Sequence, residues 1–305
     1  MDQPRVAVLP TDWALATDAI EAGGGQVVPL AEAEALVWID WHGVTGLTDL
    51  LAHAPDIRWV HLPGAGVEEF IDAGLTADDR VWTCGKGAHS ALIAEHALAL
   101  ALAGLHRVPS AARATTWGRS AVTSLFDQPI TIVGGGGIAM ALITLLTPFR
   151  CAVTVVRRRS APVPGALRTI GVDELGAGLG DARLVVLALA LTARTRGIIG
   201  RSELEIMDDH AWLVNVSRGG HVDTDALVDA LRTDVIGGAA LDVTDPEPLP
   251  EGHPLWSLPN CVITPHIAGA SAAAMKALVD RIADNVRLFG AGQPLLGLVD
   301  SDAGY

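Results

Sequence analysis

Short apolar runs alternate with longer amphipathic stretches along the first part of the chain. The apolar runs are bounded by polar or turn residues and lie at 5–9, 26–29, 35–39 and 57–62. Runs of this length and pattern predict buried strands. Between them, apolar residues recur at helical spacing at 13–22, 46–53 and 67–73. This β-α-β-α order predicts an open, mostly parallel sheet with helices on both faces.

A second β-α series follows a polar stretch at 113–127. Its strand-like runs lie at 130–133, 152–156, 184–189, 212–216, 237–241 and 262–264. Helical patterns occur between these runs, for example at 138–149 and 223–231, and long ones flank the series at 90–107 and 271–289. The series has the length of a complete domain inserted into the first one. We therefore expect one discontinuous domain, residues 1–107 plus 269–305, and an inserted domain, residues 108–268.

A glycine-rich loop stands between the first strand and the first helix of the second series. The sequence IVGGGGIAMAL places Gly134, Gly136 and Ala139 in the G-x-G-x-x-G/A spacing. The glycines permit a tight turn and let backbone N–H groups approach a pyrophosphate, and the small third residue lets helix and strand pack closely. A run of glycines can also be a flexible turn, but the strand–turn–helix context favours dinucleotide binding. The candidate cofactor contacts here are Gly134, Gly136, Gly137 and Ile138.

The residues after the next strand indicate which dinucleotide is bound. An Asp or Glu about 20 positions after the glycine loop would hold a ribose 2′-hydroxyl. Here the strand ends in Arg157, Arg158, Arg159 and Ser160, and no acid is present. The run is either a solvated basic turn or a clamp for the 2′-phosphate of NADP. We expect Arg157 and Arg158 to form that clamp, with Ser160 as a hydroxyl donor.

Composition and charge exclude several other functions. The chain has 305 residues, of which 50% are hydrophobic, so it can bury a substantial core. Its 35 acidic residues outnumber the 21 Lys and Arg, and the formal net charge of −14 argues against nucleic-acid binding. The three cysteines form neither a disulfide framework nor a C-x-x-C metal pattern. Since the pattern contains no signal sequence or bilayer-spanning run, we expect a cytoplasmic protein with no metal and no membrane partner.

Several motifs, taken in order, resemble those of one enzyme family. They are RWVHLPGAGVEEF and IAEHALALALAGLHR, followed by VNVSRGG, ALDVTDPEPLP and ITPHIAG at 214–220, 240–250 and 263–269. In these motifs and their spacing the chain resembles the D-isomer-specific 2-hydroxyacid dehydrogenases, and among them the glyoxylate and hydroxypyruvate reductases. The resemblance implies an α/β fold of two doubly wound parallel-sheet domains. A Rossmann nucleotide domain would be inserted into a flavodoxin-like substrate domain, with the active site in the cleft between them.

Three residues match the catalytic positions of that family. The resemblance assigns Arg218 to the substrate carboxylate and carbonyl, and Glu247 and His266 to an acid–base pair. An imidazole can protonate the alkoxide that forms near neutral pH, and a carboxylate beside it favours the charged ring. A guanidinium fork holds a carboxylate with two hydrogen bonds. Taken singly, each residue could be an ordinary surface or core residue. Together, after three successive strands, they indicate catalysis.

The resemblance implies further contacts around this centre. The implied cofactor contacts are Thr192, Val216, Ser217, Asp242 and Gly269, and the backbone of Ala65 and Gly66 would receive the substrate carboxylate together with Arg218 and His266. A structural turn is the alternative role for Asp242 and for the segment at 65–66. Lys86 lies near the expected substrate mouth and stays unassigned. We expect the remaining histidines of this region to pack against or cap helices and to bind no ligand; they are His89, His96 and His106.

The expected reaction is the reduction of a 2-oxo acid to a D-2-hydroxy acid, and its reverse. The arginine-rich turn makes NADP(H) the preferred cofactor, with NAD(H) as the alternative. The partner is a small 2-oxo or 2-hydroxy acid, and the resemblance implies a homodimer through the largely apolar helix at 90–107. The same scaffold could instead oxidise phosphoglycerate, formate or phosphite. A nucleotide-sensing corepressor is a further alternative, and retention of all three catalytic residues argues against it.

Overall fold

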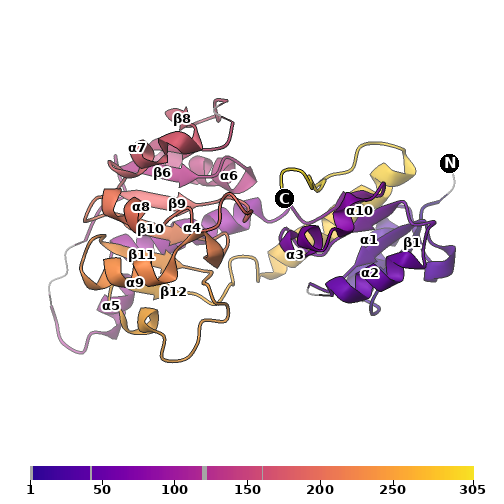
Figure 1. The fold of residues 1–305 in the computed structure, drawn as a ribbon, viewed down its shortest axis with the longest axis horizontal. Coiled ribbons are helices and arrows are strands. Elements are labelled where there is room, and N and C mark those ends of the chain that lie inside the picture. Colours follow the sequence, from indigo (N-terminus) through magenta and orange to yellow (C-terminus); the bar gives the residue numbers. More distant parts are fainter. Residues whose placement is uncertain (1–2, 42, 119–121, 160) are drawn as a thin grey trace. The chain divides into compact units, whose positions relative to one another are not determined.

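The computed structural model describes residues 3–41, 43–118, 122–159 and 161–305. The chain forms two compact units, Met1–His89 with Ser271–Tyr305 and Ser90–Ala270 (Figure 1). Each unit contains one sheet, and the strands of both sheets pair in parallel. The predicted fold class, two parallel-sheet α/β domains, is therefore confirmed.

The first unit is a five-stranded sheet in the order β2-β1-β3-β4-β5. Its strands are β1 (Arg5–Leu9), β2 (Gln26–Val27), β3 (Ala35–Trp38), β4 (Trp59–His61) and β5 (Val81–Thr83). Its helices are α1 (Ala14–Ala22), α2 (Val44–Ala52), α3 (Glu68–Asp72) and α10 (Ala272–Gly290). This order is that of flavodoxin-like sheets, in which ligands bind outside the carboxyl ends of the strands.

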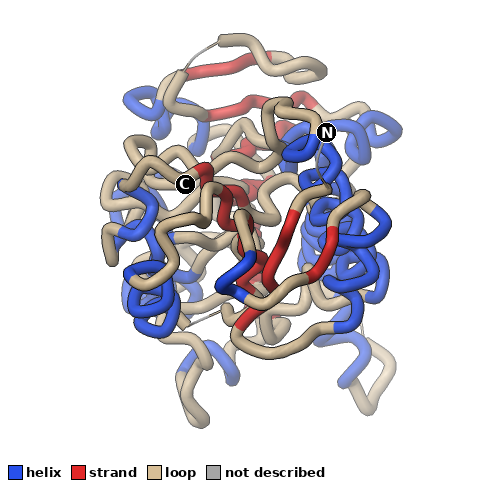
Figure 2. Tube along the Cα trace, turned by 90° about the vertical axis from the view of Figure 1, so that its right-hand side faces the viewer, coloured by secondary structure: helices blue, strands red, loops and turns tan. Residues whose placement is uncertain are grey.

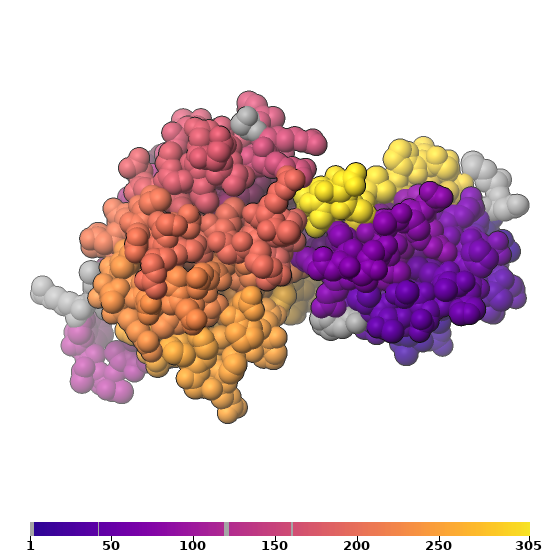
Figure 3. Space-filling view, viewed as in Figure 1, coloured from indigo at the N-terminus to yellow at the C-terminus, as the bar shows by residue number. Residues whose placement is uncertain are grey.

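Apolar side chains cover both faces of this first sheet. Leu47 of α2 and Phe70 of α3 are buried in one cluster, and Ile20 of α1 and Ile282 of α10 are buried in another. Figure 2 shows helices on both sides of the strands. The last residues of the chain, yellow in Figure 3, return to this unit through a backbone hydrogen bond to β5. The unit is thus discontinuous in sequence.

The second unit is a seven-stranded sheet in the order β12-β11-β10-β9-β6-β7-β8. Its strands are β6 (Pro129–Val133), β7 (Ala152–Val156), β8 (Arg168–Ile170), β9 (Leu184–Leu187), β10 (Trp212–Asn215), β11 (Gly238–Leu241) and β12 (Cys261–Ile263). Its helices are α4 (Ser90–Leu105), α5 (Val108–Arg113), α6 (Gly137–Leu146), α7 (Leu175–Leu179), α8 (Arg201–Ile206) and α9 (Thr224–Arg232). The chain order reverses beside β6, as in Rossmann sheets, and such a switch point forms a crevice for a dinucleotide.

Short 3-10 helices complete the secondary structure of both units. They span Leu30–Glu32, Leu75–Ala77, Thr147–Phe149, Val172–Glu174, Gly219–His221 and Pro254–Ser257. The one at Gly219–His221 begins directly after Arg218, so it belongs to the loop that follows β10.

Helix α4 packs on the second unit. Its buried residues include Ala97, Ala101 and Gly104. A side chain at Gly104 would bring its Cβ to 2.3 Å from the ring of Trp212 in β10, so glycine lets the helix approach the sheet closely. By its packing, the helix groups with Ser90–Ala270, whereas the sequence analysis placed residues 90–107 in the first domain. Small residues facing the sheet are the physical reason for the difference.

The described residues contain neither a candidate membrane-spanning helix nor a candidate metal-binding cluster. In the part of the chain that the structure describes, no helix is both long enough and apolar enough to span a bilayer. Within the same residues, no group of His, Cys, Asp and Glu side chains gathers in a way that could hold a metal ion. The three cysteines are free, and burial raises the pKa of Cys261 to about 12.

Candidate active site

The glycine loop leads from β6 into α6 at the switch point of the second sheet. Gly134 has φ of +117°, and a Cβ there would lie 2.1 Å from the carbonyl oxygen of Ala188 in the neighbouring loop. Gly136 is the N-cap of α6, and a Cβ there would meet no atom within 4 Å. Gly137 and Ile138 open the helix, whose first N–H groups have no intrahelical acceptor. The loop therefore offers backbone donors and open space, which fits a bound pyrophosphate.

Arg157 lies against this loop. A Cβ on Gly135 would approach the Arg157 Cδ to 2.8 Å and its Nε to 3.1 Å, so the guanidinium stem crosses the glycine turn. Its backbone N–H donates to Ile170 at 3.0 Å, which fixes the end of β7 against β8. Arg158 and Arg159 are exposed. Ser160, the hydroxyl donor of the expected clamp, lies outside the described residues.

The predicted cofactor contacts after β9 and β10 are tied to the backbone. The Ser217 hydroxyl donates to the Leu187 carbonyl at 2.6 Å and accepts from the Leu189 N–H at 3.2 Å. It therefore joins the ends of β9 and β10, and Val216 beside it is buried. The Thr192 N–H donates to the Thr195 hydroxyl at 2.8 Å, closing a turn after β9. These bonds hold the loops after β9 and β10 in place, and the cofactor contacts expected of Thr192, Val216 and Ser217 stay a prediction.

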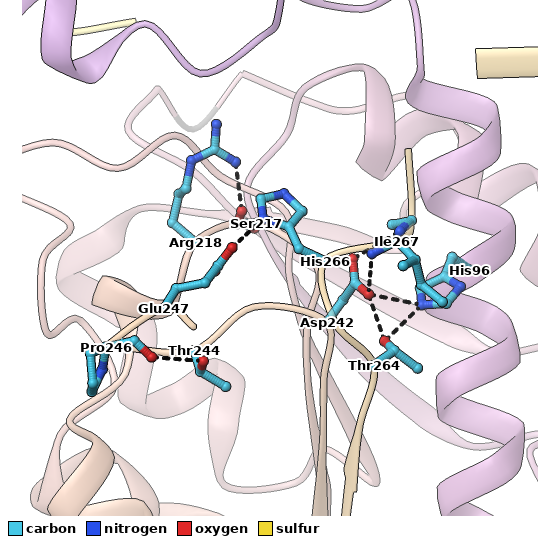
Figure 4. Close-up of polar contacts among 11 residues, drawn as sticks. His96, Ser217, Arg218, Asp242, Thr244, Pro246, Glu247, Thr264, His266 and Ile267 are labelled. Atoms are coloured by element: carbon cyan, nitrogen blue, oxygen red, sulfur yellow. Dashed lines mark hydrogen bonds and ion pairs between the residues drawn. The ribbon is translucent and has the colours of Figure 1, made fainter. Parts of the chain in front are cut away.

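Arg218 follows β10 in a loop whose backbone is held from within. The Arg218 carbonyl accepts from Asn215 Nδ2 at 2.8 Å and contacts His221 Nδ1 at 3.0 Å. Its guanidinium Nη1 donates to the Ser217 carbonyl at 2.7 Å (Figure 4). A guanidinium presents its N–H donors in a planar fork that matches a carboxylate, so the residue type fits the predicted role as a substrate anchor.

Glu247 and His266 form an ion-pair contact at the same edge of the sheet (Figure 4). Glu247 Oε1 lies 2.6 Å from His266 Nδ1, and both side chains are about half exposed. They come from the loops after β11 and β12, which are adjacent strands. Gly219 allows the loop of Glu247 to approach the loop of Arg218, since a Cβ on Gly219 would lie 1.9 Å from the Thr244 carbonyl oxygen.

Asp242 builds the turn that carries His266. Its carboxylate is buried and accepts from the Thr264 hydroxyl at 2.6 Å, the Ile267 N–H at 3.0 Å and the Ala268 N–H at 2.9 Å. Its carbonyl accepts from the His266 N–H at 2.8 Å. The structural alternative for Asp242 is thus present, and a direct cofactor contact stays a prediction. Gly269, another predicted contact, is exposed one residue after this turn.

His96 was expected to pack or cap, and this prediction is wrong in part. Its Nε2 lies 3.1 Å from the Thr264 hydroxyl and 3.2 Å from Asp242 Oδ1 (Figure 4). The sequence gives no local signal for this contact, because 168 positions separate His96 from Thr264. The His96 side chain therefore belongs to the polar network of Asp242 and Thr264, next to the loop that carries His266.

The predicted substrate loop lies in the first unit, after β4. Ala65 is exposed and Gly66 is half-buried, and among the described residues neither backbone N–H donates a hydrogen bond within the chain. His61, at the end of β4, contacts the Thr83 hydroxyl at 2.8 Å, and burial lowers its pKa to about 3. The loop therefore offers the N–H groups of Ala65 and Gly66 as donors, and it follows a strand that ends in His61, a neutral residue held by a hydrogen bond.

Lys86 and His89 follow β5 in the same unit. The Lys86 ammonium lies 4.8 Å from the centroid of the Tyr305 ring, a cation–π contact. The adjacent Gly85 donates from its N–H to the Gly64 carbonyl at 3.0 Å, so this segment borders the substrate loop. Burial lowers the pKa of His89, which is consistent with the packing role predicted for it.

Comparison with known proteins identifies the family. The family model for the NAD-binding domain of D-isomer specific 2-hydroxyacid dehydrogenases matches residues 96–268. An uncharacterized protein of Corynebacterium melassecola is 34% identical over 308 residues, covering 99% of this chain and all of that protein. The glycerate dehydrogenase of Methylorubrum extorquens is 32% identical over 257 residues, covering 81% and 80%. Glyoxylate/hydroxypyruvate reductase A of Citrobacter koseri is 38% identical over 171 residues, covering 56% and 53%.

Solved structures agree with the sequence relatives. A D-isomer specific 2-hydroxyacid dehydrogenase from Xanthobacter autotrophicus, in complex with NADPH and MES, superposes with a TM-score of 0.86 at 27% identity over both full chains. An NADPH-dependent glyoxylate/hydroxypyruvate reductase from Sinorhizobium meliloti superposes with a TM-score of 0.82 at 26% identity, covering 99% of this chain and all of that one. The chain therefore belongs to the D-isomer-specific 2-hydroxyacid dehydrogenase family and is an NAD(P)-dependent oxidoreductase, as its motifs predicted.

Proposed function

We propose that this enzyme reduces a small 2-oxo acid to a D-2-hydroxy acid with NADPH, and catalyses the reverse reaction. The observation that carries the proposal is the 2.6 Å contact between His266 Nδ1 and Glu247, on loops that follow two adjacent strands. Arg218 follows the next strand of the same sheet. A proton donor, its carboxylate partner and an anion-binding guanidinium are the groups that carbonyl reduction requires.

Each of the three residues has a distinct chemical role in the proposal. The ring that acts as the donor carries both protons: its Nδ1–H donates to Glu247, and its Nε2–H faces the carbonyl oxygen of the substrate. Hydride addition leaves negative charge on that oxygen, and His266 neutralises it by donating the Nε2 proton. Arg218 binds the substrate carboxylate and polarises the carbonyl beside it. The bound nicotinamide supplies the hydride.

The cofactor site of the proposal is the crevice beside the glycine loop. The N–H groups of Gly137 and Ile138 would face the pyrophosphate, and the close turn at Gly134 makes room for it. Arg157, which crosses that turn, and Arg158 would hold the 2′-phosphate of NADP. Structural relatives in complex with NADPH and with NADP support this preference.

The substrate class follows from the relatives and from the first unit. Relatives that act on glyoxylate, hydroxypyruvate or glycerate support a short, polar 2-oxo acid. We propose that the N–H groups of Ala65 and Gly66 receive its carboxylate, and that the unit Met1–His89 with Ser271–Tyr305 serves the substrate while the unit Ser90–Ala270 serves the dinucleotide. A homodimer is part of the proposal, since the sequence pattern of α4 is largely apolar.

A substrate screen tests the proposed reaction. The purified enzyme is incubated with NADPH and one of glyoxylate, hydroxypyruvate, pyruvate or phenylpyruvate, and the nicotinamide absorbance is followed. We expect turnover with glyoxylate or hydroxypyruvate. Phosphoglycerate, formate and phosphite are offered with NADP⁺ in parallel. Turnover of one of these three, with no reduction of any 2-oxo acid, would overturn the proposal in favour of another small anion.

Replacing Glu247 with glutamine should lower kcat for reduction by about tenfold or more. Glu247 Oε1 lies 2.6 Å from His266 Nδ1, where it orients the ring and offsets the positive charge of the ring that donates the proton. A neutral amide can still accept from Nδ1, but it cannot offset that charge. The measurement is kcat at saturating 2-oxo acid and NADPH. An unchanged kcat would show that Glu247 is not the partner of His266.

A further inference from the structure

His96, on helix α4, contacts the buried carboxylate of Asp242, which also holds the loop at 264–268 that carries His266 (Figure 4). The Asp242 side chain is 1% exposed, and the His96 side chain is 21% exposed. His96 Nε2 lies 3.2 Å from Asp242 Oδ1 and 3.1 Å from the Thr264 hydroxyl. The Thr264 hydroxyl in turn donates to Asp242 Oδ1 at 2.6 Å. Because a buried carboxylate is stabilised by its donors, this arrangement favours a His96 ring that carries a proton on Nε2.

Asp242 determines the backbone around His266. It accepts from the N–H groups of Ile267 and Ala268 through its carboxylate and from the N–H of His266 through its carbonyl. His266 has φ of +52°, a left-handed conformation that is uncommon for a residue with a side chain. Such a conformation persists where the surroundings over-determine it. The orientation of the His266 ring toward Glu247 therefore depends on where the Asp242 carboxylate points.

His96 is the anchor of this network outside the loop. Among the described residues, the other hydrogen-bond donors to the Asp242 carboxylate belong to residues 264–268, which are part of the loop itself. Those bonds can be kept while loop and carboxylate turn together. His96 comes from α4, whose residues Ala97 and Ala101 are fully buried in the second unit. The contact between His96 Nε2 and Asp242 therefore prevents the carboxylate and the loop from turning together.

We propose that His96 is a positioning residue for the reduction. Through Nε2 it holds the Asp242 carboxylate in the orientation that keeps the His266–Ala268 backbone, and hence the His266 ring, aligned with Glu247. The inference rests on the proposed role of His266 as the proton donor. It assigns His96 a task in the chemical step, in place of the packing role that its position on an apolar helix predicts.

The test compares two substitutions of His96. His96→Leu removes the donor, and His96→Gln retains an N–H donor at a similar reach. In the cofactor-free protein, the amide protons of Ile267 and Ala268 should exchange about tenfold faster in His96→Leu, and within about threefold of wild type in His96→Gln. His106→Leu, an exposed histidine just past the end of the same helix, is the matched control and should change nothing.

Kinetics should separate positioning from substrate binding. In His96→Leu we expect kcat for 2-oxo-acid reduction to fall about tenfold, because the proton donor is misaligned. KM for the 2-oxo acid should stay within about twofold, since the proposal assigns substrate anchoring to Arg218, on the loop after β10, and only alignment of the proton donor to His96. His96→Gln should restore most of kcat. A loss in both variants alike, or a change in KM alone, would overturn the proposal.

A double-mutant cycle with Asp242→Asn decides whether His96 acts through Asp242. The effects of substitutions within one network are not additive. In an Asp242→Asn background, His96→Leu should therefore cause no further increase in the exchange rates of the Ile267 and Ala268 amide protons. Additive effects would mean that His96 acts by packing, and the proposal would be wrong. The exchange measurement needs no substrate, so it judges His96 even if His266 proves not to be the proton donor.

Discussion

Replacing His266 with glutamine should lower kcat for 2-oxo-acid reduction by roughly two to four orders of magnitude. Glutamine can still donate a hydrogen bond, but it cannot release a proton to the alkoxide at neutral pH. The substitution also removes the 2.6 Å contact between His266 Nδ1 and Glu247, so no ring remains for the carboxylate to orient. Initial rates at saturating substrate, followed at the nicotinamide band, give the result.

A second histidine supplies the control for this prediction. His210 contacts Asp209 at 3.3 Å in the same unit and is also exposed, but it lies in the turn before β10, at the opposite end of that strand from Arg218. His210→Gln should leave kcat unchanged, and NADPH titrations should give nearly the same Kd in both variants and the wild type. Turnover at the wild-type rate in His266→Gln would remove His266 from the mechanism and leave the Glu247 contact as a surface ion pair.

Most strands of the two sheets were predictable because of how parallel sheets are buried. Strands covered on both faces carry continuous apolar runs, such as LVVL of β9 and ALVW of β3, and these were predicted to within two residues. The edge strands β5 and β8, with sequences VWT and RTI, carry no comparable run and were not predicted. The same is true of α7 and α8, which are five and six residues long. Helical periodicity needs a longer window than these provide.

Only those residues of the candidate site that lie in recognisable motifs could be predicted from the sequence. Arg218, Glu247 and His266 come after successive strands, so the topology brings them to one edge of the sheet. The role of His96 could not be predicted, because its partners are distant in sequence and the residue sits in an otherwise apolar helix. Ser217 was predicted as a cofactor contact from its motif. In the structure its hydroxyl is hydrogen-bonded to the backbone of Leu187 and Leu189, and nothing in the sequence indicates these bonds.

The wild-type enzyme should prefer NADPH over NADH by at least tenfold in kcat/KM. The end of β7 lies beside the glycine loop, and the strand end in this position meets either a ribose 2′-hydroxyl or a 2′-phosphate. The side chain of Arg157 lies against Gly135 of that loop, where a Cβ would approach its Cδ to 2.8 Å and its Nε to 3.1 Å. A charge-assisted hydrogen bond contributes on the order of 1.5–3 kcal/mol, and about 1.4 kcal/mol is tenfold. One such bond therefore accounts for the expected preference, and two would increase it.

Removing the two arginines should abolish this preference without impairing the use of NADH. In the Arg157→Ala/Arg158→Ala variant, kcat/KM for NADPH should fall by roughly tenfold to several hundredfold, while kcat/KM for NADH stays nearly unchanged, because NADH has no 2′-phosphate for the arginines to bind. Arg159→Ala is the matched control and should retain the preference, since we expect this exposed side chain to point away from the cofactor. Raising the salt concentration should narrow the wild-type preference, because Arg158 is exposed to solvent and its charge is screened. A wild-type enzyme that uses NADH as well as NADPH would show that the arginines form a solvated turn, and the clamp would be wrong.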